Sequence, residues 1–186
     1  MALSNRDRVG QMFEVLAPEL DEFIQKVVGA DIAADAVWTS LVEHRDTLKG
    51  ITGKQYSRTD PQLQLRMITQ GIANQVKKGW YPFSAHLSQA QISLASELFG
   101  VRNSWAHNDP FSNDDAYRAL DTAERLLKAI SSGSAADQVQ KLRLDLRRVT
   151  SDKDDKKTVK NAVVNATSTG LPAWRDVLRP HEDVAT

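Results

Sequence analysis

The sequence predicts an all-α protein, an antiparallel up-and-down helical bundle of about five helices followed by a C-terminal amphipathic helix. Apolar residues recur at three- and four-residue steps in successive segments, which is the period of a helix with one buried face. Residues that cap or end helices separate these segments, with Ser or Asp before predicted starts and Gly or Pro near predicted ends. A hydrophobic content of 41% in 186 residues is enough for an ordinary globular core.

The first two helices are predicted over Ser4–Gly29 and Asp35–Lys49. Pro18 interrupts the first pattern, so a kink or a short break is expected near Ala17. Each stripe is expected to be core, and that of the second helix consists of Val37, Trp38, Leu41, Val42 and Leu48.

A third helix is predicted to start at Asp60-Pro61 and to continue to about Lys78, because Asp is a favoured N-cap and Pro fits the first helical position. The aromatic connector at residues 79–83 is expected to seal one end of the bundle rather than to stack on RNA bases. The fourth helix starts after Ser88, whose spacing to Gln91 is that of a capping box.

A fifth helix is predicted after Ser112, which has capping-box spacing to Asp115. The loop before it is short, so this helix should pack antiparallel against the fourth. The flexible segment Ser131–Ser134 then marks a boundary. The predicted organisation is a bundle at residues 1–131, a helical extension at 132–168, and a linker toward a downstream domain at 169–186.

The candidate catalytic residues are Arg102 and His107, which lie five positions apart near the end of the fourth helix. Pro110 disfavours helical backbone before it, so the helix should end near His107 or Asn108. In a straight helix Asn103 shares a face with His107, whereas Arg102 lies about 140° around the axis. Arg102 and His107 can therefore meet only if the last turn unwinds or if a second chain contributes its own copy.

This segment resembles the R-x4-6-H signature of HEPN domains, small helical bundles found in many prokaryotic defence and toxin proteins. The matching residues are Arg102, His107 and Asn103, the polar residue that often follows the Arg. Residues 101–112, 114–121 and 124–127 look like a subgroup at the N-terminus of large prokaryotic ATPase proteins linked to phage defence and DNA modification. That subgroup is related to the HEPN domain of a eukaryotic nuclear endoribonuclease.

The resemblance implies a metal-independent endoribonuclease acting through a composite site in a homodimer, with RNA as substrate and a fused or associated ATPase as possible partner. His107 would be the general base or acid, Arg102 would neutralise charge on the phosphate, and Asn103 would orient His107 or bind phosphate. The alternative is a non-catalytic dimerisation or sensing module that regulates the ATPase. No cofactor is expected.

Simpler explanations stay open for each of these residues. Arg102 can be a structural helix residue and His107 a plain helix end, and Arg175 and His181 match the same spacing in a Pro-containing tail. Asp114, Asp115 and Arg118 follow the motif on the fifth helix. The two aspartates either cap that helix or support the site by pairing with Arg102 or orienting His107, and Arg118 could face the same pocket.

The composition restricts the chemistry further. The formal net charge is zero, whereas a strong non-specific nucleic-acid binder should carry a basic excess. Any RNA contact would therefore have to be local or cooperative, which counts against a free-standing nuclease. The chain has no cysteine, and its four histidines are scattered, so no metal site is predicted. No apolar run approaches a membrane span, and a cytoplasmic location is expected.

Overall fold

The computed structural model describes residues 3–33, 35–70 and 80–168. Within these ranges the chain forms six α-helices and two short 3₁₀ turns and contains no strand, so the prediction of an all-α fold is confirmed. The elements are α1 (Asn5–Val28), η1 (Gly29–Asp31), α2 (Thr39–Leu48), α3 (Pro61–Thr69), η2 (Pro82–Ala85), α4 (Gln89–Ala106), α5 (Asn113–Ala129) and α6 (Gly133–Ser168).

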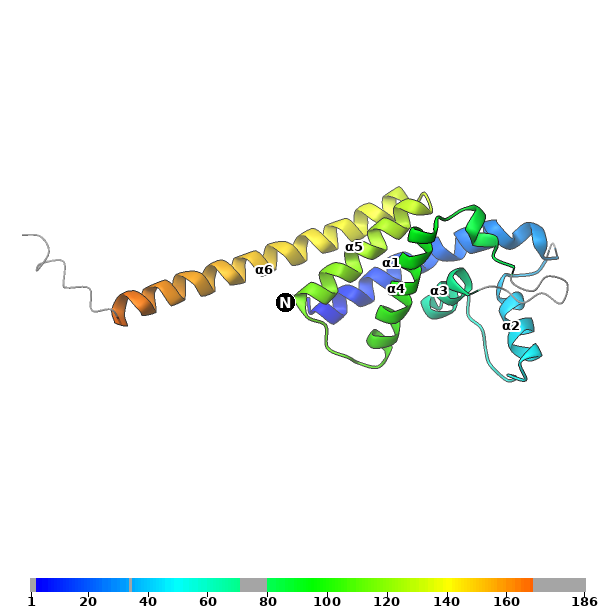
Figure 1. The fold of residues 1–186 in the computed structure, drawn as a ribbon, viewed down its shortest axis with the longest axis horizontal. Helices are drawn as coiled ribbons and strands as arrows, with labels where there is room; N and C mark the ends of the chain where they lie inside the picture. The colour runs from blue at the N-terminus through cyan, green and yellow to red at the C-terminus, as the bar shows by residue number, and fades with distance from the viewer. Residues whose placement is uncertain (1–2, 34, 71–79, 169–186) are drawn as a thin grey trace, which may run out of the picture. The chain divides into compact units, whose positions relative to one another are not determined.

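Helices α1, α3, α4 and α5 form the bundle, in which α1 packs on α3 and α5, and α4 packs on α3 and α5 (Figure 1). The start of α5 lies at the start of α1, where Asn5 Nδ2 donates to Asn113 Oδ1 at 2.9 Å. The short loop between α4 and α5 reverses the chain, so these two helices run antiparallel as predicted.

The core lies where the buried stripes of α1, α4 and α5 meet, and the first turns of α6 add to it. Its fully buried members include Met12, Leu16, Leu20 and Ile24 of α1, Ala95 and Leu98 of α4, Leu120, Ala123 and Leu127 of α5, and Ala136 and Val139 of α6. Each fully buried Val, Leu, Ile or Met side chain contributes about 1.5–3 kcal/mol through burial. The buried faces of α1, α4 and α5 therefore contribute to the core. This packing fixes the position of α4, the helix that carries the motif.

Two predicted features of the first helices differ from the structure. Helix α1 runs through Pro18 without the predicted break, because its buried face is held on both sides of the proline by the core. Helix α2 begins at Thr39 rather than at Asp35. Trp38 is fully buried and its Nε1–H donates to Asp21 Oδ1 at 2.7 Å, which ties the chain to α1 before α2 can start.

The predicted core residues at the two ends of α2 are also partly wrong. Val37 is 40% exposed and Leu48 is 49% exposed, whereas Val42 is buried. Helix α3 starts after Asp60 as predicted but ends at Thr69, where Gln70 is extended. The rest of its predicted extension, residues 71–78, lies outside the described residues. In the aromatic connector, Phe83 is buried, whereas Tyr81 is 59% exposed.

Helix α6 is continuous over its 36 residues, so the predicted C-terminal helix is present. The chain divides into two compact units, residues 1–147 and residues 148–186. The boundary predicted at 131–134 stays a prediction, and the predicted linker at 169–186 lies outside the described residues. None of the described helices combines the length and the apolarity that crossing a membrane requires.

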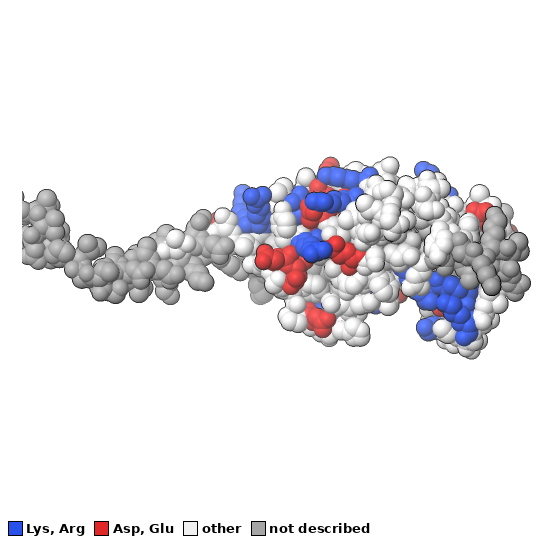
Figure 2. Space-filling model, in the orientation of Figure 1, with Lys and Arg blue, Asp and Glu red and all other residues white. Residues whose placement is uncertain are grey.

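The surface around α5 carries charges of both signs side by side (Figure 2). Three of its basic residues each pair with an acidic residue: Arg118 with Glu97 at 2.6 Å, Arg125 with Asp121 at 2.8 Å and Lys128 with Glu124 at 2.6 Å. The basic residues of α5 are therefore each paired with a carboxylate, and one of these carboxylates, Glu97, comes from α4.

Candidate functional site at the C-terminal end of α4

The predicted capping signals position the helix that carries the motif. Ser88 and Gln91 form a reciprocal capping box at the start of α4, with Ser88 N–H donating to Gln91 Oε1 at 2.8 Å and Gln91 N–H donating to Ser88 Oγ at 3.3 Å. Leu98 then anchors the middle of the helix in the core. The last turn of α4 is thereby placed at the edge of the bundle.

Helix α4 ends at the predicted place, and His107 is its C-cap. The His107 N–H still donates to the Asn103 carbonyl at 3.0 Å. Asn108 then takes a left-handed conformation with φ 62°, and the N–H of Asp109 donates to the Ser104 carbonyl at 3.0 Å. Asn adopts this conformation more readily than most residues, so it closes the helix where Pro110 prevents continuation.

The Arg102 side chain lies against the start of α3. Its Nη2 donates to Oδ1 of Asp60 at 3.1 Å, and the two side chains are 22% and 36% exposed. A partly exposed pair of this kind contributes only about 0–1 kcal/mol to stability. The guanidinium is therefore held at a defined place while it stays accessible to solvent.

Asn103 contacts the same end of α3. Its Oδ1 accepts a hydrogen bond from Gln62 Nε2 at 3.3 Å. Because the amide oxygen is used in this way, the Nδ2 group of Asn103 is the part left to donate to another partner. Two consecutive residues of α4 thus meet two residues at the N-terminus of α3.

The His107 side chain is exposed. In the part of the chain that the structure describes, its imidazole has no hydrogen-bond or ion-pair partner. Imidazole is the side chain that most often serves as a general acid or base. The residue has the access that a general acid or base needs.

Within one chain, Arg102 and His107 do not come together. Helix α4 stays regular through Ala106, so its last turn does not unwind, which was one of the two ways in which the residues could meet. The two residues keep their different directions around the axis. Arg102 faces α3, and no contact between its guanidinium and His107 is present among the described residues. Neither side chain is locked inside the hydrophobic core.

The residues predicted to support the site lie on the other side of α4. Asp115 forms a capping box with Ser112, and the side-chain and backbone hydrogen bonds from Ser112 lower the pKa of Asp115. Arg118 donates from Nε and Nη2 to the two carboxylate oxygens of Glu97 at 2.6 and 3.2 Å. Asp114 is exposed in the first turn of α5. The capping interaction of Asp115 is therefore present. That Asp114, Asp115 and Arg118 support the site stays a prediction.

A shallow groove of about 490 Å³ lies between α4 and α5 and brings together Asp115, Arg118 and Phe111. Its lining includes Val101 and Ser104 of α4 but neither Arg102 nor His107. Arg102 and Asn103 thus contact the start of α3, whereas Asp115 and Arg118 line the groove on the α5 side.

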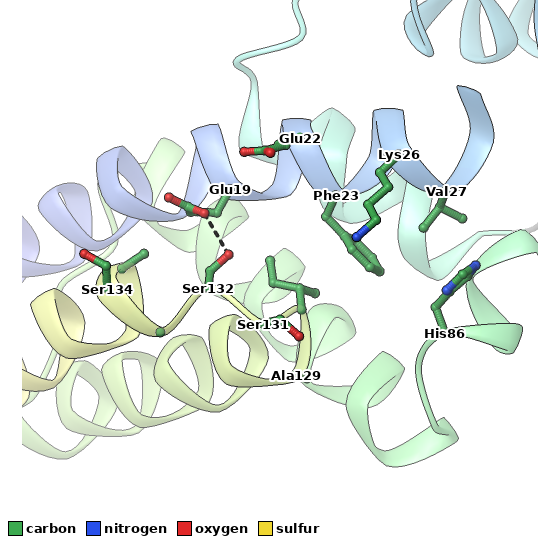
Figure 3. A pocket seen from close by; sticks show the side chains of 13 residues that line it. Glu19, Glu22, Phe23, Lys26, Val27, His86, Ala129, Ser131, Ser132 and Ser134 are labelled. Atoms are coloured by element: carbon green, nitrogen blue, oxygen red, sulfur yellow. Dashed lines mark hydrogen bonds between the residues drawn. The ribbon is translucent and has the colours of Figure 1, made fainter. Parts of the chain in front are cut away.

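A larger groove of about 580 Å³ lies at the other end of α4 and α5. Figure 3 shows Glu19, Phe23 and Lys26 of α1 opposite the turn between α5 and α6, with His86 at one side. Ser132 Oγ donates to Glu19 Oε2 at 2.7 Å across this groove. None of the motif residues lines it.

Sequence reasoning missed the contacts that hold the motif residues. Asp60 is predicted as the N-cap of α3 but not as the partner of Arg102, and Gln62 is not singled out at all. These partners are 42 and 41 residues away in the chain, and no local pattern links them. Arg6 is a further cation at this end, with its guanidinium 5.2 Å from the ring centroid of Trp105.

No group of three or more His, Cys, Asp or Glu side chains within the described ranges is arranged to hold a metal ion. Comparison with curated proteins and with solved structures finds no match. A family model described as Swt1-like HEPN matches residues 11–131, which is more than half of the chain and includes Arg102, Asn103 and His107. The chain therefore belongs to the Swt1-like HEPN family.

Proposed function

We propose that this chain is a metal-independent endoribonuclease domain whose site is completed by a second copy of the chain. One observation carries the proposal: a half-buried arginine and an exposed histidine occupy the last turn and the C-cap of one helix, and both are accessible to solvent. Membership of the HEPN family supports it, because HEPN domains are often ribonucleases.

The proposed reaction needs no group beyond these side chains and the RNA. His107 takes the proton from the ribose 2′-OH, and the 2′ oxygen attacks the adjacent phosphorus. The bond from phosphorus to the 5′ oxygen breaks, and that oxygen takes a proton from water. The products are a 2′,3′-cyclic phosphate and a 5′-hydroxyl end.

Arg102 and Asn103 would act on the phosphate. The guanidinium is permanently charged and planar, which suits it to neutralise charge that develops on the phosphoryl oxygens. The free Nδ2 of Asn103 would donate to one of the same oxygens. Asp114, Asp115 and Arg118 are proposed only as supporting residues on the α5 side.

The second copy is required because Arg102 and His107 diverge on a regular helix. In a two-fold dimer the same surface of each chain meets its counterpart. If the C-terminal ends of the two α4 helices meet there, Arg102 of one copy can share a cleft with His107 of the other.

Mixing two inactive variants tests this directly. Arg102→Ala and His107→Ala are each incubated with labelled single-stranded RNA in EDTA, alone and after co-refolding. We expect each variant to be inactive alone and the mixture to regain about a quarter of wild-type activity, because about half of the dimers are mixed and each mixed dimer has one intact site.

Two matched controls accompany this experiment. His44→Ala removes another exposed histidine, and the pair Arg175→Ala and His181→Ala removes the second match to the motif spacing, which lies outside the described residues. Both should cleave like the wild type. The nuclease proposal would be contradicted if the wild-type protein left the RNA uncleaved and formed no cyclic-phosphate product.

The second candidate is a non-catalytic dimerisation or sensing module that regulates a fused or associated ATPase in a defence protein. The paired charges of α5 favour it, because Arg118, Arg125 and Lys128 are each engaged by a carboxylate and are not free to bind an RNA backbone. On this alternative the wild type does not cleave RNA, and both motif variants change only stability or the dimer dissociation constant measured by analytical ultracentrifugation.

A further inference from the structure

The N-terminus of α3 contacts both of the consecutive residues proposed to bind phosphate. Asp60 Oδ1 accepts from Arg102 Nη2 at 3.1 Å, and Gln62 Nε2 donates to Asn103 Oδ1 at 3.3 Å. We propose that Asp60 and Gln62 are positioning residues, which hold the Arg102 guanidinium and the Asn103 amide in their working orientation before RNA binds. This inference rests on the proposed function.

Asp60 is suited to this role because its carboxylate is itself fixed. The oxygen that accepts from Arg102 also accepts from the backbone N–H of Gln62 at 2.9 Å, which is the N-cap interaction of α3. Pro61 at the first helical position restrains the backbone beside it. The carboxylate cannot leave Arg102 without also leaving the helix cap, so it is a rigid anchor rather than a mobile counter-ion.

The anchor leaves most of the guanidinium available. Arginine carries a planar fork of N–H donors, and among the described residues only Nη2 of Arg102 is engaged, by a single oxygen. Arg118 differs, because Nε and Nη2 are both used by the carboxylate of Glu97. A phosphate oxygen can therefore bind Arg102 while Asp60 remains in place.

The anchor has two opposite effects on the proposed reaction, and they can be measured separately. Orienting a group that acts in the transition state raises kcat, because its side-chain freedom is already lost before the reaction. A carboxylate beside the guanidinium, however, lowers the local positive charge and weakens binding of the anionic substrate in the ground state. Removing the carboxylate should therefore lower kcat without raising KM.

Two substitutions of Asp60 separate positioning from helix capping. Asp60→Ser keeps an N-cap side chain that is too short to reach Arg102, whereas Asp60→Asn keeps both the cap and an oxygen at the position of Oδ1. We expect Asp60→Ser to lower kcat roughly tenfold with KM unchanged or reduced. Asp60→Asn should retain kcat within about threefold of the wild type, because its oxygen still accepts from Arg102.

The matched control is Asp31→Ser, which removes an exposed carboxylate from η1. It should leave kcat, KM and the thermal midpoint unchanged. Gln62→Ala tests the second contact and should lower kcat by a smaller factor, because one neutral hydrogen bond is lost. A kcat of Asp60→Ser equal to that of the wild type, or a raised KM alone, would overturn the positioning role.

A spectroscopic readout distinguishes this inference from the nuclease proposal. The Arg102 Nη2–H signal, assigned by its loss in Arg102→Ala, should be slow to exchange in the wild type and in Asp60→Asn, because Nη2 is the group that donates to residue 60. In Asp60→Ser it should move to the position of a freely rotating arginine. If this shift occurs in a protein that does not cleave RNA, the nuclease proposal fails and the anchor stands. If the wild type cleaves RNA and the signal does not respond, the anchor alone fails.

Discussion

Two groups of polar residues near α3 differ in how completely their members are paired. The first, here called the Asp46 cluster, consists of Arg45, Asp46, Tyr56 and Arg66. Asp46 is fully buried, accepts from Arg66 Nη2 and Nη1 at 2.9 and 3.2 Å and from Tyr56 Oη at 3.0 Å, and lies 3.4 Å from Arg45 Nε. Its carboxylate has the partners that a buried charge requires.

The second group, here called the motif end, consists of Arg102, Asn103 and His107. Arg102 makes one hydrogen bond to a partly exposed carboxylate, and the His107 imidazole makes none within the described part of the chain. Removing a partner from the Asp46 cluster leaves a buried charge unpaired, which should lower the free energy of unfolding substantially. Removing one member of the motif end should lower it only slightly. The comparison separates charges that stabilise the fold from charges that are available for chemistry.

The motif end should therefore show its largest effect in activity. Arg102→Ala and His107→Ala are each expected to lower the rate of RNA cleavage about 10²–10⁴-fold, because they remove a charge-stabilising donor and a general acid or base. The same variants should lower the free energy of unfolding by about 1 kcal/mol or less. Cleavage rates in EDTA and urea unfolding curves of the same preparations measure both quantities.

The matched variant in this experiment is Arg125→Ala, which removes an exposed arginine whose partner lies one turn away on α5. It should cleave RNA like the wild type. If Arg102→Ala instead unfolds at much lower urea concentration than Arg125→Ala, then Arg102 is part of the fold and the contrast with the Asp46 cluster disappears.

The Asp46 cluster should show the opposite behaviour. Asp46→Ala leaves Arg45 and part of Arg66 buried beside each other without the carboxylate that separates them, so the free energy of unfolding should fall by about 3–5 kcal/mol. At a temperature where the variant remains folded, its rate of RNA cleavage should match that of the wild type. Chemical unfolding measures the loss of stability. The cleavage assay is run roughly 10–20 °C below the thermal unfolding midpoint of the variant, so that the protein is folded.

The same cluster gives the protein a defined dependence on pH. Burial on its own raises the pKa of Asp46, but the hydrogen bonds from Arg66 and Tyr56 and the charges of Arg66 and Arg45 outweigh it, so the pKa is lowered in the folded state. Stability from this carboxylate is therefore present above the unfolded value of about 3.9 and is lost as pH falls through the lower folded value.

The difference in free energy of unfolding between the wild type and Asp46→Asn should accordingly be constant from about pH 7 to about pH 5 and shrink below about pH 4. Denaturant titrations at a series of pH values measure it. Asp31→Asn serves as the control, since it changes an exposed carboxylate outside the cluster. A difference that grows on acidification would mean that Asp46 is not held ionised by its partners.

Much of the bundle could be predicted from the sequence, because its signals are local. The capping boxes at Ser88 and Ser112 and the Asp60-Pro61 start each involve residues within three positions of one another. The helical apolar period of α1 and α5 marks their buried faces for the same reason. The end of α4 was also predictable, since Pro110 restricts the backbone before it.

The features that the sequence did not reveal depend on contacts between distant segments. The late start of α2 follows from Trp38 binding Asp21 on another helix. The partners of Arg102 and Asp46 are set by how α3 lies between α2 and α4, and neither pairing has a signature in the residues nearby. Sequence reasoning could therefore identify Arg102 and His107 but not the residues that orient them.

The smallest effect is expected for Arg118 of α5, whose Nε and Nη2 both donate to the carboxylate of Glu97. Arg118 is 76% exposed, and an exposed pair of this kind stabilises the fold by at most about 1 kcal/mol. If pairing decides which charges take part in chemistry, Arg118→Ala should change the rate of RNA cleavage by less than about threefold. Glu97→Gln sharpens this test, because it frees the Arg118 guanidinium without removing it and should strengthen RNA binding at low salt in a filter-binding assay. A loss of cleavage in Arg118→Ala as large as that in Arg102→Ala would show that a bidentate carboxylate partner does not keep an arginine out of the site.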